Sequence, residues 1–214
     1  MARGTLITIE GIDGAGKSTL ARALHESLAA QGHRVEMLRE PGGVELSERI
    51  RALVKDPALE ISARAEALLY AAARAQLVQQ RVLPLLEDGA IVLLDRYVDS
   101  SLAYQGAARE LGVEQVRLVN DCATGGLQPD RTLLLRIDPA AGRARQDGRG
   151  EQPDRLERED EAFFACIAAA YDELAAAEPQ RIHVLDASFT PATVLADALA
   201  ALGDLLASDS AARD

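Results

Sequence analysis

Residues 11–19 read Gly11-Ile12-Asp13-Gly14-Ala15-Gly16-Lys17-Ser18-Thr19, which fits the pattern G-x-x-x-x-G-K-[ST] of a phosphate-binding loop. The apolar, β-branched run before it, residues 6–10, predicts a strand, and the helix formers after it predict a helix. Glycines let successive backbone N–H groups point at an anion, and the dipole of the helix adds positive charge at the same place. We therefore expect all nine residues to bind the phosphates of a nucleotide, with Lys17 on the β and γ oxygens and Ser18 on Mg²⁺.

The composition limits the partners that this chain can have. It has 214 residues and a formal net charge of -11 at pH 7, which favours one domain and disfavours a general surface for nucleic acid or an anionic membrane. A small phosphorylated ligand stays compatible if positive charge is concentrated locally. Cys122 and Cys166 lie far apart in the sequence, which indicates neither a zinc site nor a disulfide framework and favours a reducing, cytoplasmic compartment. No apolar run approaches the roughly 18 residues of a membrane span.

Hydrophobic periodicity predicts an α/β chain in which strands alternate with helices. We expect strands near residues 6–10, 35–38, 90–94, 132–137 and 182–185. We expect helices over residues 19–31, 45–54, 64–87, 97–108, 113–124, 163–177 and 191–206, with a break at Pro84. Five such strands specify a parallel sheet with helices on both faces, the three-layer fold typical of phosphate-binding-loop NTPases. Residues 1–207 are predicted to form one domain with a mobile lid at about 142–157, and residues 208–214 a disordered tail.

A second element of the phosphate site follows the third predicted strand. Asp95 ends that apolar run, where a carboxylate reaches Mg²⁺ opposite Ser18, although it could instead cap the next helix. The neighbouring Arg96 offers a planar fork of N–H donors to phosphate oxygens, with a structural ion pair as the alternative.

Asp13 is an unusual choice inside a loop that binds phosphates, because a carboxylate repels them. Accepting a hydrogen bond from a sugar hydroxyl would explain it. A solvated turn residue that tolerates the backbone angle explains it equally well.

The predicted lid is rich in arginine. Any one of Arg143, Arg145, Arg149 and Arg155 could neutralise the charge that develops on a transferring phosphoryl group, or could simply belong to a solvated run of charges. Tyr70 and Tyr104 could each stack on a base or belong to the core.

Several motifs resemble those of thymidylate kinases. The segment Asp95-Arg96-Tyr97 and the following Ser100-Ser101-Leu102-Ala103-Tyr104-Gln105-Gly106 resemble the signature of that family. Arg39-Glu40-Pro41-Gly42-Gly43, Gly125-Gly126-Leu127-Gln128-Pro129-Asp130, Asp154-Arg155-Leu156-Glu157 and Asp186-Ala187 also resemble motifs of the family. The resemblance spans nearly the whole chain and implies transfer of the γ-phosphoryl group of ATP to dTMP with Mg²⁺, for dTTP synthesis, by a homodimer.

The same resemblance implies roles for individual residues. ATP is expected on residues 11–19, Mg²⁺ on Ser18 and Asp95, and the acceptor sugar's 3′ hydroxyl on Asp13. Arg51 and Arg96 are expected to hold the acceptor phosphate, with Glu40 and Pro41 also in the dTMP site. Tyr70, in place of the usual Phe, is expected to stack on thymine, Arg74 to contact a thymine carbonyl, and Ser101 and Gln105 to read the base edge. Tyr104 is expected to exclude a 2′ hydroxyl.

One position divides the family that this chain resembles. Some members carry an arginine in the loop at the position of Gly14, whereas many bacterial members have glycine there and take the catalytic arginine from the lid. This chain resembles the second type. Arg149 is our first choice for that role, followed by Arg143 and Arg145.

Two other functions remain open at this point. The chain could phosphorylate another nucleoside monophosphate or a deoxynucleoside, or it could be a non-catalytic nucleotide switch. The sequence has no N-K-x-D guanine signature and no second acidic residue directly after Asp95, which disfavours the switch.

Overall fold

The computed structural model describes residues 3–148 and 153–211, and its centre is a five-stranded sheet. The strand order is β2-β3-β1-β4-β5 and every neighbouring pair is parallel. The strands are β1 (Thr5–Glu10), β2 (Val35–Arg39), β3 (Ile91–Asp95), β4 (Arg131–Arg136) and β5 (Ile182–Asp186). Register places Ile9 of β1 beside Asp95 of β3. The predicted five-stranded parallel sheet is confirmed, with the phosphate-binding loop leaving its central strand.

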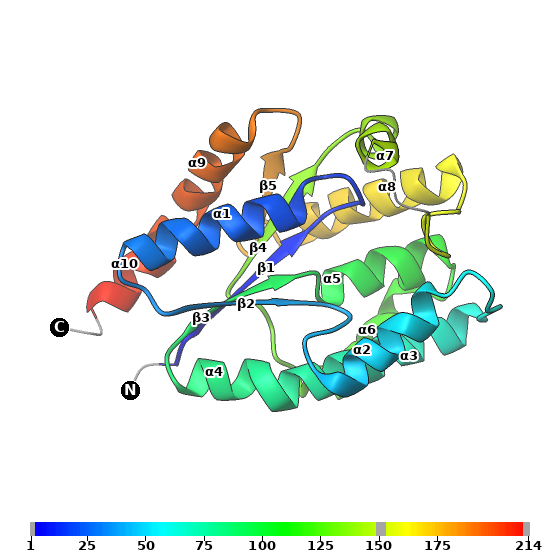
Figure 1. The fold of residues 1–214 in the computed structure, drawn as a ribbon, viewed down its shortest axis with the longest axis horizontal. Coiled ribbons are helices and arrows are strands. Elements are labelled where there is room, and N and C mark those ends of the chain that lie inside the picture. Colours follow the sequence, from blue (N-terminus) through cyan, green and yellow to red (C-terminus); the bar gives the residue numbers. More distant parts are fainter. Residues whose placement is uncertain (1–2, 149–152, 212–214) are drawn as a thin grey trace.

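Helices cover both faces of the sheet, as Figure 1 shows. Helices α1 (Lys17–Ala30) and α9 (Pro191–Ala201) pack against each other on one face. The other face carries α8 (Glu161–Ala177), which packs on β4 and β5. Helices α2 (Glu45–Lys55), α3 (Ala63–Leu77) and α6 (Val113–Thr124) form a further layer in which α3 contacts both others. A cleft can therefore form between this layer and the carboxyl ends of the strands.

Two predicted helices contain π-helical segments that the periodicity did not indicate. The run predicted at 64–87 is α3, then the π segment η1 (Val78–Val82), then α4 (Leu83–Glu87). Pro84 sits in the first turn of α4. Proline has no backbone N–H to donate to the carbonyl four residues earlier, and a π-helical turn before it shifts the register of the backbone hydrogen bonds. Likewise, the predicted helix 97–108 is α5 (Val98–Ser101) followed by the π segment η2 (Leu102–Ala108).

The first residues of the predicted lid lie in a helix. Helix α7 (Pro139–Asp147) covers its first residues, and the Asp138 carboxylate accepts hydrogen bonds from the N–H groups of Ala140 and Ala141. An aspartate N-cap followed by proline at the first helical position is a strong helix start. Helix α7 is absent from the helices that periodicity predicted, although its capping residues indicate it.

The C-terminal helix differs from the prediction as well. In place of one helix over 191–206, α9 ends at Ala201 and α10 (Gly203–Ala211) follows. The predicted start of a tail at residue 208 falls inside α10, and residues 212–214 lie outside the described part of the chain.

Candidate active site

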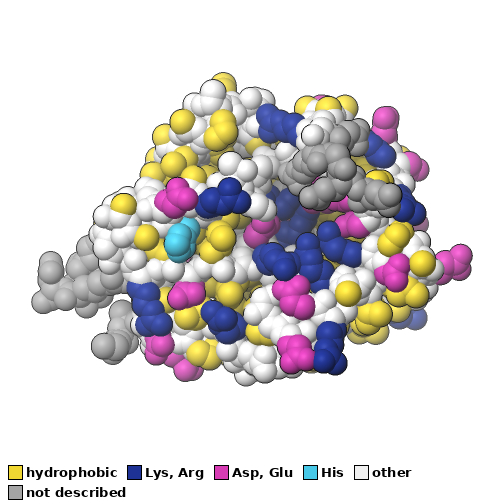
Figure 2. Space-filling view, in the orientation of Figure 1, with side chains coloured by type: hydrophobic (Ala, Val, Ile, Leu, Met, Phe, Trp, Pro, Cys, Tyr) yellow, Lys and Arg dark blue, Asp and Glu magenta, His cyan; other side chains and the backbone are white. Residues whose placement is uncertain are grey.

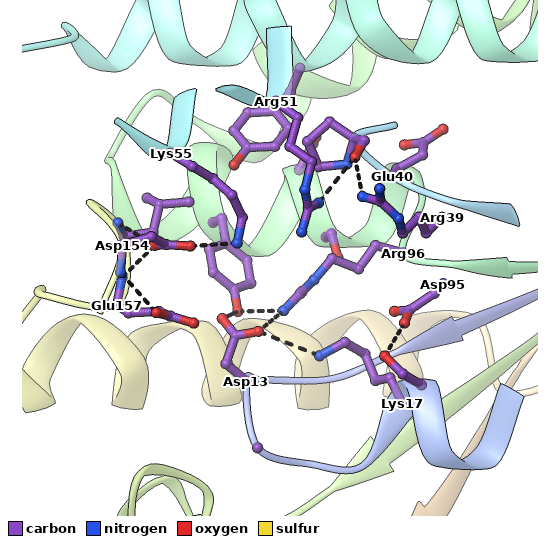
Figure 3. A pocket seen from close by; sticks show the side chains of 18 of the residues that line it. Asp13, Lys17, Arg39, Glu40, Arg51, Lys55, Asp95, Arg96, Asp154 and Glu157 are labelled. Atoms are coloured by element: carbon purple, nitrogen blue, oxygen red, sulfur yellow. Dashed lines mark hydrogen bonds and ion pairs between the residues drawn. The ribbon is translucent and has the colours of Figure 1, made fainter. Parts of the chain in front are cut away.

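The cleft lies at the carboxyl ends of β1, β2 and β3, facing α2 and α3 (Figure 3). It encloses about 280 Å³. Its basic lining residues are Lys17, Arg39, Arg51, Lys55, Arg74 and Arg96. Figure 2 shows Lys and Arg side chains gathered at this hollow of the surface. A chain of net charge -11 thus concentrates positive charge at one place, as a phosphorylated ligand requires.

The phosphate-binding loop joins β1 to α1 with its glycines in left-handed conformations. Gly14 has φ +79° and Gly16 has φ +99°, angles that a side chain disfavours. Ser18 follows at the start of α1, and its hydroxyl donates a 2.8 Å hydrogen bond to Asp95 Oδ2. The structure thus brings together the two residues expected to share a metal ion.

Lys17 is buried at the base of the loop. Its Nζ donates to the carbonyl of Ile12 at 2.9 Å and lies 3.7 Å from Asp13 Oδ1. Burial, together with repulsion from Arg96, lowers the pKa of Lys17 to about 8, against the attraction of Asp13. The ammonium group is therefore held at a cost in stability, because a buried cation lacks water.

Arg96 connects the phosphate-binding loop to the opposite side of the cleft. One of its terminal nitrogens lies 2.6 Å from Asp13 Oδ1, and the other donates to the Gly11 carbonyl and to Ser100 Oγ. Its guanidinium carbon lies 5.1 Å from the centroid of the Tyr104 ring. Although burial opposes both charges, each group stabilises the other, so the pKa of Arg96 is raised and that of Asp13 is strongly lowered.

The backbone of Arg96 is strained, and Glu10 holds it. Arg96 has φ +70°, an uncommon value for a residue with a side chain. The fully buried Glu10 carboxylate accepts hydrogen bonds from the N–H of Tyr97 at 2.7 Å, from Ser100 Oγ at 2.5 Å and from the Tyr171 hydroxyl at 2.9 Å. Burial raises the pKa of Glu10. Sequence reasoning missed Glu10, because it reads as the last residue of a strand.

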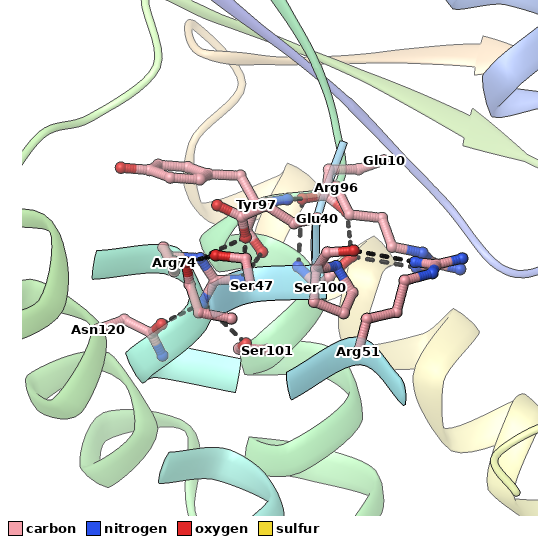
Figure 4. A network of polar contacts seen from close by, with 12 residues as sticks. Glu10, Glu40, Ser47, Arg51, Arg74, Arg96, Tyr97, Ser100, Ser101 and Asn120 are labelled. Carbon is pink, nitrogen blue, oxygen red and sulfur yellow. Dashed lines mark hydrogen bonds and ion pairs between the residues drawn. The ribbon is translucent and has the colours of Figure 1, made fainter. Parts of the chain in front are cut away.

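At the other end of the cleft, Arg74 is the centre of a buried network (Figure 4). It donates to Glu40 at 2.7 Å, to Ser101 Oγ at 2.9 Å, to the Tyr97 carbonyl at 2.8 Å and to Asn120. A guanidinium has five N–H donors; four of them make these contacts, and a terminal nitrogen also lies 2.7 Å from Glu40 Oε2.

Glu40 is only partly satisfied by that network. Its Oε1 is buried with no hydrogen-bond partner among the described residues. Burial raises the pKa of Glu40 to about 7 in spite of Arg74. The next residue, Pro41, offers its carbonyl to Arg51 at 3.0 Å and to Arg39 at 3.3 Å, which fixes two cations at the edge of the cleft.

The remaining predicted acceptor residues also line the cleft. Tyr70 is packed beside Ile50 and Val54, and its burial raises the pKa of its hydroxyl. The hydroxyl of Tyr104 lies 3.3 Å from Asp13 Oδ2. Gln105 donates from Nε2 to Glu66 at 2.8 Å, a contact that the sequence gave no reason to expect.

The lid arginines that the structure describes are engaged away from the loop. Arg143 donates to the Glu159 carbonyl at 3.1 Å, and Arg145 donates to the Ala187 carbonyl at 3.0 Å. Arg155 lies 2.5 Å from Glu66 and donates to the Val54 carbonyl. Arg149 lies outside the described residues.

Helix α7 rests directly on the phosphate-binding loop. A Cβ atom on Gly14 would lie 2.0 Å from the Gly142 carbonyl oxygen, and one on Gly142 would lie 2.9 Å from the Asp13 carbonyl oxygen. The two backbones approach this closely only because both residues are glycine. An arginine at position 14 is therefore incompatible with this position of α7.

The structure adds a group of cleft residues to which the sequence analysis assigned no role. Lys55 lies 2.6 Å from Asp154, and Leu156 and Glu157 line the cleft beside it. Lys55 is one of only two lysines in the chain, and that rarity was an available signal.

In residues 3–148 and 153–211, no helix is both long and apolar enough to cross a membrane. Within the same ranges, no cluster of three or more His, Cys, Asp or Glu side chains is arranged to hold a metal ion.

Comparison with known proteins shows the family to which this chain belongs. The sequence model described as "Thymidylate kinase" matches residues 9–198. The chain belongs to the thymidylate kinase family. It is 51% identical over 188 residues to the thymidylate kinase of Deinococcus radiodurans, covering 88% of this chain and 91% of that one. It is 47% identical over 209 residues to that of Clavibacter sepedonicus, covering 98% and 99%.

A solved structure agrees with this membership. The crystal structure of thymidylate kinase from Ehrlichia chaffeensis superposes with a TM-score of 0.76 at 27% identity, covering 94% of this chain and 99% of that one. The predictions of a phosphate-binding-loop fold and of a nucleotide kinase that phosphorylates dTMP are confirmed. Thymidylate kinases take the phosphoryl group from ATP. The alternatives of another nucleotide kinase and of a switch are not favoured.

The burial of Lys17 generates a prediction that separates stability from activity. The Lys17 pKa is about 8 in the folded chain and about 10.4 when unfolded, so the cost of burying its charge is fully present below pH 8. That cost disappears as the pH rises through 10.4. Lys17→Met should abolish phosphoryl transfer and yet raise the Tm at pH 7 without nucleotide by about 2–4 °C, or ~1 kcal/mol.

Calorimetry at pH 7 and at pH 10 with a coupled kinase assay measures both effects. The advantage of Lys17→Met in Tm should shrink at pH 10. A Tm several degrees below that of the wild type at pH 7 would show that pairing with Asp13 outweighs burial.

Proposed function

We propose that the cleft holds the γ-phosphoryl group of ATP between Lys17 and Arg96 and passes it to the phosphate of dTMP. This proposal rests on one observation: Lys17 and Arg96 both approach Asp13 Oδ1, at 3.7 Å and 2.6 Å respectively. Lys17 belongs to the loop and Arg96 follows β3. Two cations from opposite sides of a cleft suit a phosphoryl group in transit, whose charge spreads over its oxygens.

Residues 11–19 would hold the donor. The backbone N–H groups of the glycine-rich loop and the N-terminus of α1 face the same space, and anions bind such helix starts. Lys17 would contact the β and γ oxygens there.

Ser18 and Asp95 would hold Mg²⁺. Their oxygens are 2.8 Å apart, and Mg²⁺ commonly takes only one or two protein oxygens beside water and substrate phosphates, so the donor set fits. When bound, the ion neutralises charge on the β and γ phosphates.

The opposite wall of the cleft would hold dTMP. Arg96 and Arg51 would contact its phosphate, with the segment of Glu40 and Pro41 fixing Arg51. Asp13 would contact the 3′ hydroxyl, and Tyr104, whose hydroxyl already lies 3.3 Å from Asp13, would fill the space of a 2′ hydroxyl.

The base would lie beside Tyr70, with Ser101 and Gln105 at its edge. Arg74 would reach a thymine carbonyl by exchanging its neutral partner Asn120.

These groups perform phosphoryl transfer by positioning and by charge. An in-line displacement needs no covalent intermediate, so the residues named above orient the two substrates and stabilise the developing charge. A lid at about 142–157 would close over the site and exclude water, which otherwise competes as the acceptor.

The chain is also proposed to act as a homodimer in the cytoplasm. Leu53, Leu68 and Leu118 are 47%, 53% and 70% exposed on the adjoining helices α2, α3 and α6, and the family resemblance implies a dimer.

Sedimentation equilibrium tests the dimer. It should give twice the mass of one chain for the wild type and the mass of a single chain for Leu118→Glu. Phe189→Glu, at a residue outside these helices that is 56% exposed, should stay dimeric. Both cysteines are unpaired, which suits a reducing compartment.

A substrate panel tests the proposed site as a whole. With ATP and Mg²⁺, the purified chain should give a kcat/KM for dTMP well above those for dUMP, dCMP, AMP and GMP, because the base, sugar and phosphate are each contacted. Comparable values for all five acceptors would contradict the proposed acceptor site.

Arg149 is proposed to supply the positive charge of the closed lid, because Arg143, Arg145 and Arg155 are bound elsewhere. Arg149→Ala should lower kcat by about 10³ with a smaller change in the KM for dTMP. The matched control is Arg158→Ala, which removes an exposed arginine near the same segment and should leave kcat within about twofold. A near-normal kcat for Arg149→Ala would transfer the role to Arg143 or Arg145.

A further inference from the structure

Glu66 is a buried carboxylate to which the proposed function gives no role. It lies in the first turn of α3 and is 0% exposed. Its Oε1 accepts the 2.8 Å hydrogen bond from Gln105 Nε2, and its Oε2 lies 2.5 Å from Arg155. Arg109 Nε lies 3.5 Å from Oε1. Two arginines thus compensate the charge of this buried carboxylate.

The contact with Glu66 fixes which end of the Gln105 amide faces the substrate. An ionised carboxylate only accepts hydrogen bonds, so it selects the NH₂ end of the amide. Because the oxygen and the nitrogen of an amide point in different directions, Oε1 is turned away from Glu66, on a side chain that lines the cleft. Reversing the amide would bring its oxygen against the carboxylate at 2.8 Å in a buried site, where repulsion is strong.

The positive charge of Arg74 orients Ser101, as the negative charge of Glu66 orients Gln105. Arg74 NH1 donates to Ser101 Oγ at 2.9 Å, so the serine oxygen is an acceptor there. Its own proton must then point away from the guanidinium. Ser101, which also lines the cleft, can therefore present a donor where Gln105 presents an acceptor.

We propose that Glu66 is a positioning residue that sets base selectivity by holding the Gln105 carbonyl oxygen toward N3 of the pyrimidine. Thymine carries a hydrogen on N3 next to carbonyl oxygens, whereas N3 of cytosine is an acceptor beside an amino group. An acceptor from Gln105 and a donor from Ser101 match thymine and oppose cytosine. This inference rests on the proposed placement of the base beside Gln105.

Glu66→Gln tests the proposal with the least change in shape. A neutral amide at position 66 accepts either orientation of Gln105, so the amide can turn to suit cytosine. The ratio of kcat/KM for dTMP to that for dCMP should fall by about 10-fold or more. A purely structural role of Glu66 would lower both values together and leave the ratio unchanged.

The control is Arg155→Gln. It removes the cation from Glu66 Oε2 and leaves the Oε1 contact with Gln105 in place. It should keep the substrate ratio within about twofold, whatever its effect on kcat. An equal fall of the ratio in this variant would overturn the proposal, since anchoring of the segment around Arg155 would then set selectivity.

Gln105→Leu separates this inference from the proposed function. If Gln105→Leu leaves the ratio unchanged, the base does not lie against Gln105 and the proposed placement fails. If Gln105→Leu lowers the ratio but Glu66→Gln does not, the placement stands and the role of Glu66 is rejected. Should Glu66→Gln fail to fold, Glu66→Asp decides in its place, because it keeps the charge but withdraws the carboxylate from Gln105. It should lower the ratio several-fold, and an unchanged ratio rejects the role.

Discussion

The placement of Arg96 is the constraint on which the cleft depends. Two carboxylates at the end of the central strand determine it: Glu10 binds the backbone around Arg96, and Asp13 binds its guanidinium at 2.6 Å. The first contact stabilises a left-handed backbone that would otherwise relax. The second aims the side chain across the cleft. A site that must receive anions is thus kept rigid by internal anions until the substrate phosphates arrive.

At both ends of the cleft, the charged side chains are held in pairs of opposite sign. Lys17 and Arg96 share Asp13, Arg74 is paired with Glu40, and Glu66 is paired with Arg155. Each pair is partly or wholly removed from water, so neither member can move without leaving the other uncompensated. Such pairing orients neutral neighbours such as Ser101 and Gln105 more firmly than hydrogen bonds between neutral groups can.

The sequence was sufficient for the parts of the molecule that local chemistry determines. Glycines at 14 and 16 with Lys17 specify the phosphate-binding loop, and the apolar run before Asp95 specifies a buried strand. The sequence was insufficient where tertiary contacts determine the local structure. Pro84 predicts an interruption but not the π turn that absorbs it, and α7 was missed although Asp138 and Pro139 carry the start of a helix. Glu10 and Glu66 look like ordinary acidic residues, because only the fold surrounds them with donors.

The contact between Gly14 and Gly142 bears on how such enzymes can change over evolutionary time. With a Cβ at position 14 only 2.0 Å from the Gly142 carbonyl, an arginine introduced into the loop would first have to displace α7, which also carries Arg143 and Arg145. We therefore expect position 14 and the lid to change together rather than position 14 alone.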